Sequence, residues 1–242
     1  MYERSKLRKS AENRIYAISD VLWKKGRIAH HGLERNGTNF LRACCVAVGA
    51  RPINFTDPKP GNPTHKHYRW YSDKTNISKI LVEGVAHEHS ASSTDDLNAI
   101  AAYPPHTGHL VIQKSKVQAL ASMYNFCHRK RWITSEEDIK SVILCLNEDY
   151  DSYYNFWANM EIKEPGRVSI VDYLALTNDP HILEVALQKL GIRSAHYPKR
   201  FYFSNLEMSP QTRELYISAE EVSRILNKLK KSSGRPLGNK QL

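Results

Sequence analysis

Apolar positions along the chain form two kinds of pattern, short runs typical of buried strands and longer stretches with helical spacing. Four runs of the first kind predict β-strands at residues 27–32, 64–71, 109–114 and 167–173. Helical spacing predicts helices between and after them, the longest from residue 139 to 157. Because strands alternate with helices, the pattern predicts an α/β fold with a parallel sheet and helices on both faces.

The other helices are predicted by the same spacing and by capping signals. Ser218 and Glu221 have the separation of a capping box at the start of the last helix. Pro180 opens the helix that Gly191 closes. Helical patterns cover residues 15–22, 40–48, 97–102, 116–131, 182–190 and 222–229.

The turn at residues 34–37 links the first strand to its helix and predicts an anion site. Unpaired backbone N–H groups of a first helical turn point at one spot, where the helix dipole favours negative charge. Arg35 adds a fixed positive charge, Gly37 permits close backbone approach, and Thr38 and Asn39 can each donate a hydrogen bond. An ordinary strand-to-helix turn with Asn-Gly chemistry is the competing interpretation, and no Walker A sequence is present.

Ligands of parallel α/β sheets bind beyond the carboxyl ends of the strands. This rule places Arg35, residues 65–69, Lys114 and the pair Asp172 and Tyr173 along one edge of the predicted sheet. In a strand, His65 and His67 share one face, so groups able to exchange protons or bind anions converge there. We therefore expect a single crevice at this edge.

Composition sets bounds on the kind of protein. A chain of 242 residues with 41% hydrophobic content suits one domain, residues 1–242, ending in a polar, basic tail at 232–242. The net charge of +10 favours anionic partners. The four cysteines lack C-x-x-C spacing, which predicts reduced, buried thiols and a cytoplasmic setting. The sequence shows neither a signal peptide nor an apolar run long enough to span a membrane.

Three segments together resemble the sulfotransferases that use 3′-phosphoadenosine 5′-phosphosulfate (PAPS). The first is Glu34-Arg35-Asn36-Gly37-Thr38-Asn39-Phe40, which is similar to the family's loop for the 5′-phosphosulfate. The resemblance implies that residues 35–40 bind this group, with Asn36 standing where the family usually has Ser. It also implies a P-loop NTPase-like three-layer sandwich.

The second and third segments extend the likeness to residue 191. Lys114 ends a strand and Ser122 follows eight positions later, which is similar to the family's site for the 3′-phosphate, although Arg is commoner than Lys there. Tyr173 stands after the last strand, but the family's acidic pair after that Tyr is missing. Residues 72–108 show no likeness, and we expect them to form a variable insertion on the acceptor side.

The resemblance implies in-line transfer of a sulfuryl group from PAPS to a hydroxyl or amine, without a metal, releasing 3′,5′-adenosine bisphosphate. By analogy with phosphoryl transfer, catalysis would be mostly positioning and charge stabilisation. Arg35 would neutralise the leaving phosphate oxygen, and His67, or else His65, would take the acceptor's proton, with Lys66 as a donor to the transferred group. The acceptor stays open among a glycan, a small molecule, a lipid and a peptide.

Two other functions compete with this interpretation. The pairs His65-x-His67 and His87-x-His89 can each place two imidazoles on one strand face, as ligands of a metal-dependent enzyme would require. The positive charge and the Tyr and Trp content favour a nucleic-acid-binding or nucleotide-binding protein without catalysis. Against specific nucleic-acid binding, no recognised motif occurs and the aromatic residues have core spacing.

Overall fold

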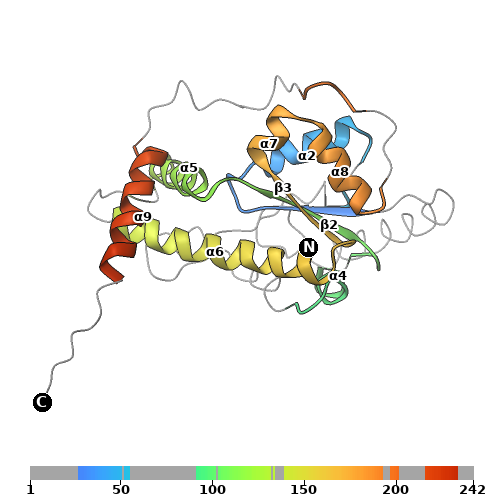
Figure 1. Cartoon of the computed structure of the whole chain (residues 1–242), viewed down its shortest axis with the longest axis horizontal. Coiled ribbons are helices and arrows are strands. Elements are labelled where there is room, and N and C mark those ends of the chain that lie inside the picture. Colours follow the sequence, from blue (N-terminus) through green and yellow to red (C-terminus); the bar gives the residue numbers. More distant parts are fainter. Residues whose placement is uncertain are drawn as a thin grey trace, which may run out of the picture.

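The fold is that of a computed structural model, drawn as a ribbon in Figure 1. The structure describes residues 27–50, 52–54, 91–101, 103–131, 133, 139–192, 197–201 and 216–233. All structural statements below refer to these described residues.

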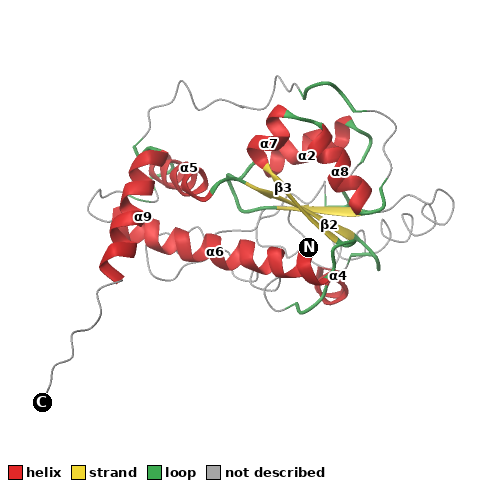
Figure 2. Ribbon diagram, viewed as in Figure 1, coloured by secondary structure: helices red, strands yellow, loops and turns green. Residues whose placement is uncertain are grey.

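A parallel three-stranded sheet lies at the centre of the fold (Figure 2). The strands β1 (Ile28–His31), β2 (Gly108–Gln113) and β3 (Val168–Asp172) stand in the order β1-β2-β3. All three were predicted, and their parallel pairing is confirmed. The remaining predicted strand, at residues 64–71, lies outside the described residues.

Seven helices surround this sheet in the described part of the chain. Six of them match predicted helices, whereas the short α7 that directly follows β3 was not expected. The long α6 continues two turns beyond its predicted end at residue 157. Their bounds are α2 Thr38–Ala47, α4 Thr94–Ala101, α5 Lys116–Arg129, α6 Ile139–Lys163, α7 Tyr173–Asn178, α8 His181–Lys189 and α9 Ala219–Ser233.

Helices cover both faces of the sheet, as the alternation of elements predicted (Figure 1). On one face, α2, α7 and α8 pack on strand residues that include Leu110 and Ile112. On the other, α5, α6 and α9 form a second core that includes Val111 and Val168. The described residues thus build three layers, helix, sheet and helix, with one apolar core on each side.

The aromatic side of α6 belongs to the core rather than to a base-stacking surface, which confirms the prediction from its spacing. Tyr150, Tyr153, Tyr154 and Trp157 are all buried. The hydroxyl of Tyr154 donates to the carbonyl oxygen of Ile112 at 2.9 Å. This bond fixes α6 against the middle strand.

The predicted capping signals are present. The backbone N–H of Glu221 donates to Ser218 Oγ at 3.2 Å, and the backbone N–H of Ser218 donates to Glu221 Oε2 at 2.9 Å. These reciprocal bonds are the capping box that starts α9. Gly191 follows Leu190, the C-cap of α8, and its φ of 73° ends the helix where the sequence predicted.

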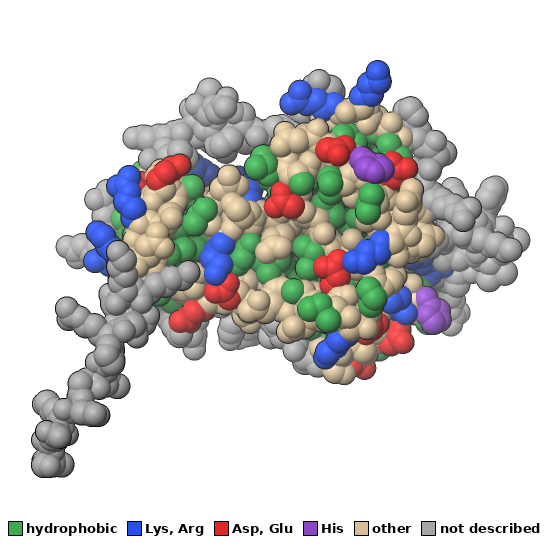
Figure 3. Space-filling view, in the orientation of Figure 1, with side chains coloured by type: hydrophobic (Ala, Val, Ile, Leu, Met, Phe, Trp, Pro, Cys, Tyr) green, Lys and Arg blue, Asp and Glu red, His purple; other side chains and the backbone are tan. Residues whose placement is uncertain are grey.

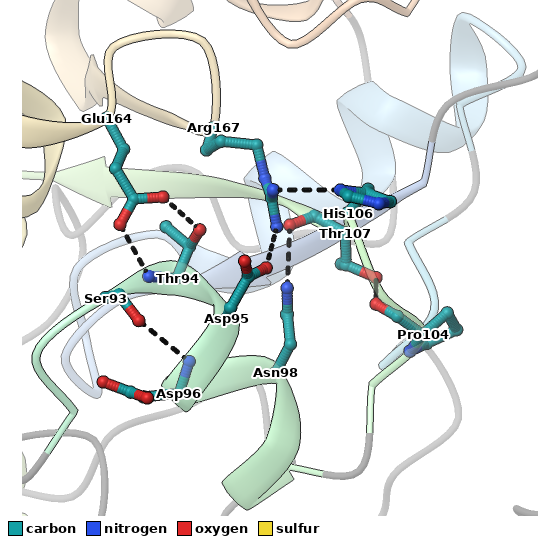
Figure 4. A network of polar contacts seen from close by, with 10 residues as sticks. All are labelled: Ser93, Thr94, Asp95, Asp96, Asn98, Pro104, His106, Thr107, Glu164 and Arg167. Carbon is teal, nitrogen blue, oxygen red and sulfur yellow. Dashed lines mark hydrogen bonds and ion pairs between the residues drawn. The ribbon is translucent and has the colours of Figure 1, made fainter.

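Helix α4 is fastened at the amino ends of β2 and β3 by the polar network of Figure 4. Glu164 accepts hydrogen bonds from the backbone N–H and the hydroxyl of Thr94, and Arg167 pairs with Asp95 at 3.0 Å. His106 Nδ1 lies 3.3 Å from the Arg167 guanidinium. The described part of the expected insertion therefore lies at the sheet edge opposite the carboxyl ends of the strands.

All four cysteines are buried and free, as predicted. Burial is the main reason why the pKa values of Cys45 and Cys127 rise to about 12, so these thiols stay protonated and unreactive. Among the described helices, none combines the length and the apolar character that crossing a bilayer requires.

Candidate functional site

The turn between β1 and α2 has the backbone geometry of a tight loop aimed at the carboxyl edge of the sheet. The N–H of Asn36 donates to the carbonyl oxygen of Leu33 at 3.1 Å and closes the turn. Arg35 and Gly37 have φ values of 69° and 97°, both in the left-handed region. This region suits Gly but costs a side-chain-bearing residue free energy, so Arg35 is held there by the surrounding structure.

Helix α2 begins directly after this loop, so the positive end of its dipole lies at the loop. Gly37 is the residue before its first turn and supplies no side-chain cap, and that turn carries no acidic residue. The N–H of Leu41 donates to the carbonyl oxygen of Gly37 at 2.9 Å. The amino end of α2, with its positive dipole and no acidic side chain in the first turn, therefore meets the electrostatic requirement of an anion site.

The side chains of the loop differ in exposure. Arg35 and Asn39 are exposed, whereas Thr38 is only 1% exposed, so Arg35 and Asn39 present their side chains at the surface of the loop and Thr38 does not. Asn36 is completely buried, and its amide nitrogen donates to the carbonyl oxygen of Glu34 at 3.3 Å. The side chain of Asn36 thus shapes the turn itself.

Lys114 joins this loop from the end of β2. Its Nζ lies 3.5 Å from the backbone carbonyl oxygen of Arg35 and 4.9 Å from the centre of the Tyr173 ring. Burial, and then the positive charge of Arg35, lower the pKa of Lys114 below its usual value. An anion bound here would counter both effects, because it would place a negative charge beside the partly desolvated ammonium of Lys114.

Tyr173 connects the loop to the end of β3. Its ring packs against Gly37 and meets the Phe40 ring edge-on, with the centroids 5.6 Å apart. Burial, with a smaller effect from Cys44, raises the pKa of its hydroxyl. Residues that follow all three strands, Arg35, Lys114 and Tyr173, are therefore gathered at one place, as the rule for parallel sheets predicted.

Helix α5 forms the remaining wall of the site. The Arg35 guanidinium lies over the Phe126 ring, 4.9 Å from its centre, in a cation–π contact. Ser122 is half-buried one helical turn before Phe126, on the same side of α5. The arrangement brings the helix face of Ser122 toward the two cations.

Three buried histidines were not singled out by the sequence. His31 Nε2 and His109 Nδ1 lie 3.0 Å apart and share a hydrogen bond beneath Trp157. The His30 ring bonds to Asn54 Oδ1 at 2.7 Å. Burial, with a contribution from Arg167, lowers the pKa of His109 to about 3, so its imidazole is neutral. The sequence signal that could have revealed these three histidines is their position inside predicted strands, because residues there are usually buried.

The proposed proton acceptors, the lysine between them and the proposed metal pairs lie outside the described residues. These are His65, Lys66, His67, His87 and His89. Within the ranges that the structure describes, no group of three or more His, Cys, Asp or Glu side chains is arranged to hold a metal ion.

Charge on the surface drawn in Figure 3 is mixed. The described Lys and Arg side chains on that face stand among Asp and Glu side chains rather than in one basic field. On this face the described side chains therefore form no continuous stripe of cations of the kind that tracks a nucleic-acid backbone.

No family model matches the chain, and neither the curated proteins nor the solved structures contain a match to it. The fold and the site place the described part of the chain in a structural class, the parallel α/β proteins. Its strand ends bring two cations together beside the start of a helix.

Proposed function

We propose that the protein is a PAPS-dependent sulfotransferase. The observation that carries the proposal is the contact between Lys114 Nζ and the Arg35 carbonyl oxygen at 3.5 Å. Because the two segments that resemble separate phosphate-binding motifs meet there, one doubly charged adenosine nucleotide has cations for both of its ends. The proposal includes a P-loop NTPase-like form of the three-layer fold.

In the proposed reaction an acceptor oxygen or nitrogen attacks the sulfur while the bond from sulfur to the donor's phosphate oxygen breaks. The leaving oxygen keeps the bonding electrons, and Arg35 together with the positive end of the α2 dipole would stabilise its charge. Lys114 and Ser122 would hold the 3′-phosphate. His67, with His65 as the second candidate and Lys66 beside it, would take the acceptor's proton.

The four buried thiols fit this proposal in a reducing compartment, and we place the protein in the cytoplasm. The nucleotide and an acceptor are its proposed partners.

Isothermal titration calorimetry with 3′,5′-adenosine bisphosphate is the most direct experiment. We expect saturable binding, with weaker binding of adenosine 5′-monophosphate, which lacks the charge that Lys114 would meet. Folding of the sample should be checked by circular dichroism in the same buffer. Folded protein that shows no binding of the bisphosphate would overturn the proposed function.

A further inference from the structure

A pocket of about 520 Å³ opens beside Lys114, on the α6 side of the strand ends. Its walls come from the end of β2, the start of α5, the middle of α6 and the last residue of β3. The volume lies within the range of about 300–1,000 Å³ that is typical of small-molecule sites. Every lining residue belongs to the described part of the chain.

The floor of the pocket is rigid and its polar groups are already engaged. The Tyr150 hydroxyl donates to the Lys114 carbonyl oxygen at 2.6 Å and accepts from Gln113 Nε2 at 3.0 Å. Tyr154 is 4% exposed and bonded to the sheet. These rings support the pocket from below and offer little aromatic face to a ligand.

The mouth of the pocket carries polar groups of both kinds. Lys116 forms an ion pair with Asp151, and Asn155 is exposed one helical turn further along α6. Asp172 Oδ1 accepts from the N–H of Ala175 at 2.8 Å, which fixes the carboxylate and leaves its second oxygen for a ligand. Lys114 is the second cation of the lining and Asp172 the second carboxylate.

This set of groups selects a class of ligand. Two ammonium groups and two carboxylates give the pocket no net charge, so an anionic or a cationic ligand gains no overall attraction. An apolar ligand would strip water from four charged groups, which is costly. A hydroxyl both donates and accepts, so a molecule with several hydroxyls can bond to carboxylate, amide and ammonium together.

We propose that this pocket binds a neutral, hydroxyl-rich molecule such as a monosaccharide unit. Asp172, Asn155 and Lys116 would hydrogen-bond its hydroxyls. Lys114 borders both this pocket and the loop of Arg35, so the bound molecule lies one side chain away from the proposed nucleotide. That it is the sulfuryl acceptor rests on the proposed function, whereas the binding itself does not.

In the experiment, saturation-transfer NMR and calorimetry measure the binding of a panel of probes to the full chain. The neutral probes are N-acetylglucosamine, methyl α-glucoside and myo-inositol, and the comparison probes are glucose 6-phosphate and 4-nitrophenol. We expect saturable binding of at least one neutral probe and weaker binding of both comparison probes. Binding should persist when 3′,5′-adenosine bisphosphate is present at saturation.

Two matched substitutions test the lining. Asp172→Asn keeps an oxygen to cap α7 but removes the charge. We expect this substitution to weaken binding of the neutral probe about tenfold, because a charge-assisted hydrogen bond is lost. Asp179→Asn is the control, because Asp179 also caps a helix, at His181, but does not line the pocket. Asn155→Ala should also weaken binding of the neutral probe. Asn159→Ala, which changes a residue further along α6, should leave that binding unchanged.

The outcomes separate this proposal from the proposed function. If the bisphosphate binds but no neutral probe does, the pocket proposal is wrong and the sulfotransferase proposal stands. If a neutral probe binds and the bisphosphate does not, the reverse holds. If the bisphosphate displaces the probe and Asp172→Asn weakens binding of the bisphosphate, the pocket is part of the nucleotide site and the pocket proposal is overturned.

Discussion

The ring of Tyr173 lies so close to Gly37 that a Cβ atom at residue 37 would stand 2.4 Å from Tyr173 Cδ2. The contacted atom belongs to a rigid ring that also packs against Phe40, so the ring has little room to move away. Gly37 also has a φ of 97°, where residues with a side chain are strained. The loop and the end of β3 are therefore built to fit one another only with Gly at this position.

Gly37→Ala should lower the free energy of unfolding by about 2–4 kcal/mol, from backbone strain of about 1 kcal/mol and overpacking of about 1–3 kcal/mol. Urea unfolding followed by circular dichroism measures this loss. Gly49→Ala is the control, because Gly49 has a φ of 79° but no atom within 4 Å of the added Cβ. Equal losses in the two variants would contradict the close contact, and Tyr173→Ala should restore part of the stability that Gly37→Ala removes.

Arg35→Ala and Lys114→Ala should each weaken the binding of 3′,5′-adenosine bisphosphate about tenfold or more, because each removes a charge-assisted bond to a phosphate. Calorimetry of the variants gives the two dissociation constants. Each should also reduce the salt dependence of binding.

Surface cations of the same type provide the controls. Arg131 is exposed and has a φ of 57°, so Arg131→Ala removes the same charge from a residue with the same left-handed backbone as Arg35. Lys140 is exposed at the start of α6 and controls for Lys114. The assignment of Arg35 is wrong if its variant binds the nucleotide as well as Arg131→Ala does.

His67→Ala should leave nucleotide binding intact and lower turnover, because a general base contributes about 10²–10⁴-fold to a rate. Release of the bisphosphate from PAPS in the presence of a neutral sugar acceptor measures turnover. His65→Ala is the comparison, and we expect the smaller loss there. Unchanged turnover in His67→Ala would remove this residue from its proposed role.

Local patterns in the sequence were enough to predict most of the described fold. The runs that became β1, β2 and β3 are largely buried because helices cover both faces of the sheet, and burial on both faces favours apolar residues along the run. The capping box of Ser218 and Glu221 is likewise local, since its two residues are one turn apart. The rule for strand ends then brought Arg35 and Lys114 together correctly.

Features that depend on register or on distant packing were not predictable. His31 and His109 are 78 positions apart and pair only because β1 lies beside β2 with Ala29 opposite His109. The contact of Tyr173 with Gly37 depends on where β3 ends relative to the loop. Helix α7 was missed because Asp172 caps it through a side chain that the pattern had assigned to the end of a strand.

The buried pair His31 and His109 makes stability depend on pH. Burial is the main reason why the pKa of each imidazole is lowered. The neighbouring His109 lowers the pKa of His31 further, and Arg167 lowers the pKa of His109 further. The folded-state pKa of His109, about 3, lies below the unfolded value of about 6.5. Between these two pH values the unfolded chain binds a proton that the folded chain does not, so stability falls as pH drops below about 6.5 and is unaffected above it.

His109→Gln should therefore flatten the pH dependence of stability on the acid side. Gln keeps a polar side chain beside His31 but cannot titrate, so the loss of unfolding free energy between pH 7 and pH 5 should be smaller than in the natural protein by about 2 kcal/mol. Urea unfolding at pH 5, 6, 7 and 8 gives the two curves. Parallel curves for the natural protein and His109→Gln would mean that His109 is not held neutral by its burial.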